Sequence, residues 1–77
     1  MYDSNVMDFP IERYFPIQDS RDLLLRLTIG IHKGKFWVEA DLVSKEGRKI
    51  LNHLGFREGQ DNLYDATQKG LSLYYDQ

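Results

Sequence analysis

The sequence contains no cysteine, only two prolines and two histidines, and no apolar run of about 18 residues that could span a membrane. The missing cysteine excludes disulfides and thiolate-bound metals as supports for the fold. A chain of 77 residues buries only about 60% of the surface that its unfolded form exposes, so close packing or a partner subunit must stabilise it. No signal-peptide pattern opens the sequence. Together with the lack of cysteine, this predicts a cytoplasmic protein.

The sequence also lacks a large excess of either positive or negative charge. The net charge of −2 gives no general attraction to nucleic acid. The ends of the chain are acidic and the centre is mildly basic, through Lys33, Lys35, Lys45, Arg48 and Lys49. This distribution is typical of an ordinary solvated surface, and it also suits a patch for an acidic partner.

What the sequence does contain is a strict alternation over residues 23–42, which predicts a β-hairpin. A two-residue loop at Lys33 and Gly34 places every apolar pair on one face. These pairs are Ile31 with Phe36, Ile29 with Val38, Leu27 with Ala40, and Leu25 with Leu42. The other face pairs Arg26 with Asp41, Thr28 with Glu39, and Gly30 with Trp37. A slip of one residue would reverse the faces, so the register is strongly specified. A four-residue loop over 32–35 would keep the same pairs.

Residues 1–20 carry both prolines and no clear periodicity, which predicts an extended N-terminal arm before a single domain over 21–77. The arm is too apolar for a free tail. We expect it to pack on the chain's own core, the alternative being a second protein or a second copy of the chain. Its apolar residues are Phe9, Ile11, Tyr14, Phe15 and Ile17.

A helix is predicted over residues 44–54. Ser44 is a good N-cap, and Ile50, Leu51 and Leu54 form a narrow apolar stripe at helical spacing. Gly55 would cap its end, and Phe56 would pack back on this helix. The expected core therefore lies between this stripe and the apolar face of the hairpin.

Two interpretations remain open for residues 70–75. Leu71, Leu73 and Tyr75 alternate as in a strand, whereas Leu71, Tyr74 and Tyr75 have the spacing of a helix face. The β-propensity of tyrosine and the presence of Gly70 favour the strand. The predicted fold is thus α+β: a hairpin (23–42) packed by one helix (44–54), followed by a C-terminal hairpin or strand.

Catalytic and metal-binding patterns are sparse. We expect His32 at the hairpin tip and His53 at the end of a helix, too far apart to form a metal site together, so no metal or other cofactor is predicted. Glu39 and Asp41 lie on one strand face, where they suit cross-strand partners better than a pair of catalytic carboxylates. The glycines form no phosphate-binding loop, and no activated nucleophile is visible. The sequence therefore predicts a protein that is not an enzyme.

Trp37 is the strongest candidate for a binding residue. It is the only tryptophan, it lies opposite the apolar ladder, and tryptophan is favoured in protein interfaces. The alternative is that Phe9 or Phe15 of the arm covers it. We expect a non-catalytic protein-binding module, such as an adaptor, an inhibitor or a small accessory factor. The small core also suits a homodimer. The predicted contacts are Trp37, Arg26, Glu39, Phe15 and Tyr14.

Residues 50–56 (ILNHLGF) and 63–71 (LYDATQKGL) resemble the closing part of winged-helix DNA-binding domains. In that family a recognition helix ends in Leu-Gly-hydrophobic, a wing follows, and a Leu-Thr-x-Lys-Gly segment starts the last helix; Ala66 replaces the usual Leu of that segment. The resemblance implies an alternative function as a DNA-binding protein or transcriptional regulator. Its groove and phosphate contacts would be Arg48, Lys49, Asn52 and His53.

Overall fold

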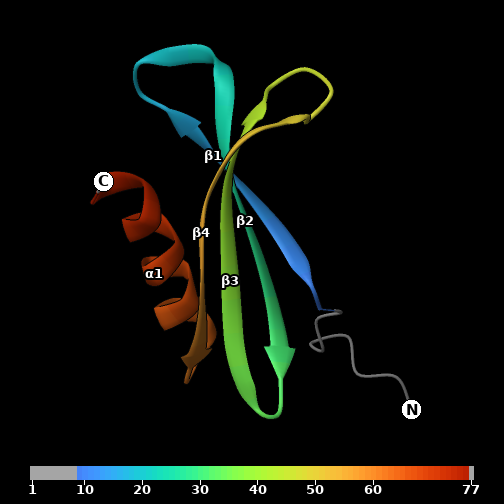
Figure 1. Cartoon of the computed structure of the whole chain (residues 1–77), viewed down its shortest axis with the longest axis vertical. Helices are drawn as coiled ribbons and strands as arrows, with labels where there is room; N and C mark the ends of the chain where they lie inside the picture. The colour runs from blue at the N-terminus through green and yellow to red at the C-terminus, as the bar shows by residue number, and fades with distance from the viewer. Residues whose placement is uncertain (1–8, 77) are drawn as a thin grey trace.

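The computed structural model describes residues 9–76 as a four-stranded antiparallel sheet followed by one helix (Figure 1). The strands follow one another in space as they do in sequence, in the order β1-β2-β3-β4. Their bounds are β1 Ile11–Ile17, β2 Ser20–His32, β3 Lys35–Ser44 and β4 Ile50–Gln60, and the helix α1 spans Leu63–Tyr75. The fold is α+β, as the sequence predicts, but its helix comes after all the strands.

The predicted hairpin is confirmed in detail. β2 and β3 pair in the expected register, from Leu25 opposite Leu42 to Ile31 opposite Phe36. The loop has two residues, Lys33 and Gly34, with φ angles of 52° and 79°. Positive φ at both central residues matches the twist of the flanking strands, which is why such tight loops favour this conformation.

The predicted helix over 44–54 is wrong. Residues 45–48 form a turn, and β4 begins at Ile50 and pairs with β3. The Ser44 hydroxyl does bond to backbone, as in an N-cap, but it accepts from the Lys49 amide and donates to the Glu46 carbonyl, at 2.9 Å and 2.7 Å. It therefore closes a turn instead of starting a helix. Ile50 and Leu51, expected in the core, are about half exposed.

The prediction of a C-terminal hairpin or strand is also wrong, because residues 63–75 form α1. The N-cap is Asn62, whose side chain accepts a hydrogen bond from the Asp65 amide at 2.7 Å. The presence of Gly70 favours a strand in the sequence, but in the structure this glycine allows close packing of α1 on the sheet. A Cβ there would lie 2.8 Å from side-chain atoms of both Leu27 and Val38. The glycine lets the helix approach the sheet.

The core lies between α1 and one face of the sheet. Five alternating strand residues are buried there together with Ala66 of the helix: Leu25, Leu27, Ile29, Val38 and Ala40. Leu54, Leu71 and Leu73 pack around them. Ile31, which the sequence predicts to be in the core, is 47% exposed. No helix between residues 9 and 76 is both long and apolar enough to cross a membrane.

The described part of the predicted arm belongs to the sheet. β1 pairs with β2, from Ile11 opposite Ile29 to Phe15 opposite Leu25. Phe9 packs edge-on against Phe36, with ring centroids 5.6 Å apart. Phe9, Ile11, Phe15 and Ile17 therefore contact the chain's own core. Residues 1–8 lie outside the described residues.

Candidate functional site

The face of the sheet opposite α1, here called the open face, carries one row of polar residues that crosses all four strands. Tyr14 lies opposite Arg26, Arg26 opposite Asp41, and Asp41 opposite His53. The row consists of these four residues. Because facing residues of neighbouring strands have their side chains close together, the pairing alone brings the four groups into contact.

Asp41 is the centre of the row. Arg26 Nη2 lies 3.3 Å from Asp41 Oδ2, and His53 Nδ1 lies 2.8 Å from Asp41 Oδ1. Glu39 approaches the same imidazole, with its Oε2 at 3.6 Å from His53 Nδ1. The Asp41 side chain is 3% exposed and that of Arg26 15%, whereas His53 and Glu39 are about half exposed. The cluster thus has a desolvated side and an accessible side.

The Arg26 guanidinium is held in its charged form. Burial by itself lowers the pKa of Arg26, but the hydrogen bond and charge of Asp41, with smaller contributions from Tyr14 and Glu12, raise it above its ordinary value. Arg26 Nε is buried and has no hydrogen-bond partner in the described residues. A buried charge needs a partner, and here Asp41 is that partner.

Arg48 contacts the other end of the row. Its guanidinium carbon lies 4.2 Å from the centre of the Tyr14 ring, within the range of a cation–π contact. A side chain from the turn between β3 and β4 therefore reaches β1 on the open face. The Tyr14 hydroxyl donates to Glu12 at 2.8 Å.

An aromatic pair lies beside the polar row. Trp37 and Phe56 stack with ring centroids 5.7 Å apart and an angle of 27° between planes. The indole covers Gly30, where a Cβ would lie 2.2 Å from Trp37 Cζ2. Phe56 is 44% exposed. Trp37 is thus packed against Phe56, and the predicted cover from Phe9 or Phe15 is wrong because both pack toward the core on the opposite face.

A small hollow of about 200 Å³ adjoins this aromatic pair at the hairpin tip. Its walls combine two aromatic rings with two lysines and one glutamate, and its volume has room for one partner side chain. The lining residues are His32, Lys33, Lys35, Phe36, Trp37, Glu58 and Gly59.

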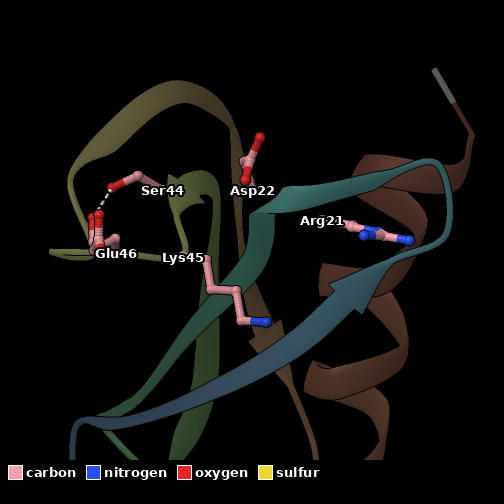
Figure 2. Close-up of a pocket in the computed structure, with 5 residues that line it drawn as sticks. All are labelled: Arg21, Asp22, Ser44, Lys45 and Glu46. Carbon is pink, nitrogen blue, oxygen red and sulfur yellow. Dashed lines mark hydrogen bonds between the residues drawn. The ribbon is translucent and has the colours of Figure 1, made fainter.

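A wider cleft of about 760 Å³ lies at the opposite end of the sheet, where β2 begins and the β3–β4 turn returns (Figure 2). Its five lining residues bring two basic and two acidic side chains together: Arg21, Asp22, Ser44, Lys45 and Glu46. The Lys45 amide donates to the Asp22 carbonyl at 2.8 Å and joins the two segments. The balanced charges select neither an anion nor a cation.

The structure brings most of the predicted partner-binding residues together. Trp37, Arg26, Glu39 and Tyr14 share the open face, whereas Phe15 lies on the other face, against the core. His53 belongs to this cluster as well, although the sequence predicts a role for it only in the DNA-binding alternative. The strand pattern of residues 23–42 reveals Arg26 and Asp41. It could not reveal His53, because residues 50–56 do not alternate.

The structure has no recognition helix at residues 44–54, where the winged-helix resemblance implies one. Arg48 lies in a turn and Asn52 and His53 lie on β4, so these residues share no recognition helix. The DNA-binding alternative therefore loses its groove-reading element. Only the last helix of the resemblance has a counterpart, in α1.

Comparisons with models of known protein families, with curated proteins and with solved structures found no match to this chain.

Proposed function

We propose that this protein is a non-catalytic protein-binding module whose contact surface is the open face of the sheet, centred on Trp37. The observation that carries the proposal is the Trp37–Phe56 stack on the open face. Large aromatic side chains supply much of the binding energy in protein interfaces when a partner excludes water around them.

The surroundings of the stack support the same role. The hollow beside Trp37 gives a partner side chain a place to insert. Glu39 lies directly opposite Phe56, and a charged group at the rim of an apolar contact favours one partner orientation over others. A second copy of the chain is one candidate partner, since a small domain gains stability by burying such a face.

The test is affinity capture from a native extract with the tagged full-length protein, followed by mass spectrometry and light scattering. We expect the wild-type protein to capture a partner protein in stoichiometric amount, or to form a dimer with a second copy of the chain. Trp37→Ala should weaken capture by at least about tenfold, since hot-spot truncations typically cost about 2 kcal/mol or more.

The matched control is Tyr64→Ala, which removes an aromatic side chain that is 71% exposed on α1. It should leave capture unchanged. Circular dichroism confirms that both variants fold. If wild type elutes only as free monomer, or if both variants capture as wild type does, the open face is not the contact surface.

A further inference from the structure

Three ligand atoms converge on the accessible side of the polar row. His53 Nδ1 lies 2.8 Å from Asp41 Oδ1 and 3.6 Å from Glu39 Oε2. One ligand atom from each residue lies within 4.8 Å of the other two. Zinc ligands about 2.0–2.2 Å from the ion stand roughly 3.0–3.6 Å apart around it. The two His53 distances lie near this range, and the two carboxylate oxygens, at most 4.8 Å apart, would move together around an ion. We propose that Glu39, Asp41 and His53 bind a divalent transition-metal ion of the zinc class.

The strand register builds this site. Glu39 and Asp41 are two residues apart on β3 and therefore share the open face. His53 joins them because of a bulge in β4. Gly55 pairs with Ala40 and His53 pairs with Asp41, leaving Leu54 as the extra residue. In an unbulged strand, His53 would lie opposite Leu42 and point to the helix side. Bulges often redirect a side chain in this way at functional sites.

Arg26 organises the central ligand. It holds Asp41 Oδ2 at 3.3 Å, so Oδ1 remains directed at His53. A metal ligand fixed by an outer hydrogen bond is typical of protein metal sites. The two carboxylates and one guanidinium leave a net charge of −1 when His53 is neutral, which favours a cation. The half-exposed His53 and Glu39 give the ion a route from solvent.

The ligand types favour zinc over calcium or magnesium. An imidazole nitrogen suits zinc, copper or nickel, whereas the two harder cations take mostly oxygen ligands and waters. Three protein ligands leave the fourth tetrahedral position to water. This inference is independent of the protein-binding role, since an ion can bind whether or not a partner covers the open face.

The test is titration of the full-length protein with zinc chloride by isothermal calorimetry. We expect one ion per chain. Glu39→Gln and His53→Gln each replace a half-exposed ligand, so both variants should fold, and each should weaken binding by at least about tenfold. The control His32→Gln changes the other histidine, at the hairpin tip, and should bind as wild type. Asp41 is kept because its loss would also remove the partner of Arg26.

Cobalt gives a second readout. Co²⁺ in a four-coordinate site absorbs visible light much more strongly than aqueous Co²⁺. The bound ion should also quench the fluorescence of Trp37, which stacks on Phe56, the strand partner of Glu39. Both signals should disappear in His53→Gln. The proposal is overturned if wild type binds no zinc, if either ligand variant binds as wild type, or if His32→Gln loses as much affinity as His53→Gln. Displacement of zinc by equimolar magnesium would overturn the assignment of a transition metal.

Discussion

A single carboxylate joins three strands on the open face. Asp41 is 2% exposed, and it contacts Arg26 of β2 and His53 of β4 from its own place on β3. Burial removes water from both charges of the Arg26–Asp41 pair, so each depends on the other for compensation. The consequence is an asymmetry: the intact pair adds little net stability, but removing one partner leaves the other uncompensated.

Asp41→Asn should therefore destabilise the fold strongly. The change leaves Arg26 charged, largely buried and without its counter-charge, which typically costs about 3 kcal/mol. The measurement is urea unfolding followed by Trp37 fluorescence. The contrasting variant is Asp61→Asn, which breaks the pair of Asp61 with Lys35 on the surface, where solvent screens both charges. Equal midpoints for the two variants would show that the burial of Asp41 has no energetic consequence.

At the scale of elements, β4 explains why part of the fold was not predictable. Its register against β3 shifts three times, between Gln60 and Arg57, between Gly55 and His53, and between Asn52 and Ile50. Each shift inserts a residue and reverses the alternation, so the period of two disappears. The remaining pattern of Ile50, Leu51 and Leu54 imitates a helix. Bulges of this kind also protect an edge strand from pairing with other chains.

β2 and β3 illustrate the opposite case. Their alternation is unbroken from Leu23 to Leu42, and the register, loop and core face all followed from it. The polar pair of Arg26 with Asp41 was predictable for the same reason. The contact of His53 with Asp41 was not predictable, because the position of His53 depends on a bulge that leaves no local signal. The prediction of a helix over residues 44–54 failed because pairing with β3, and not the local sequence pattern, determines the conformation of β4.

The N-cap of α1 offers a test of how the helix begins. Asn62→Ala removes the side-chain oxygen that accepts from the Asp65 amide at 2.7 Å, and the unpaired amide should cost about 1 kcal/mol. We expect the thermal midpoint to fall by about 4–8 °C. Asn52→Ala, at an exposed position of β4, is the matched control and should shift it much less. If the thermal midpoint of Asn52→Ala fell further than that of Asn62→Ala, the N-cap would not be the asparagine contact that stabilises the fold.

For the whole molecule, we expect the sheet and α1 to unfold as one cooperative unit, because each covers the apolar face of the other. A chain of 77 residues has a total stability of about 4–12 kcal/mol. α1 contributes Ala66, which is fully buried among the strand residues, and Gly70, which rests on Leu27 and Val38. Loss of this contact would expose the whole core.

Ala66→Asp should consequently unfold the entire protein. The new carboxylate would lie within the apolar core cluster at a fully buried position, and an isolated charge there costs several kcal/mol, comparable with the total stability. We expect no cooperative thermal transition, and strong binding of a hydrophobic dye. Gln68→Asp adds the same charge two residues later, at an exposed position of α1, and should retain a cooperative transition. If Ala66→Asp kept the far-ultraviolet signal of the sheet and lost only that of α1, the strands would be stable without the helix. The open face would then be stabilised by the polar row and by Trp37 with Phe56.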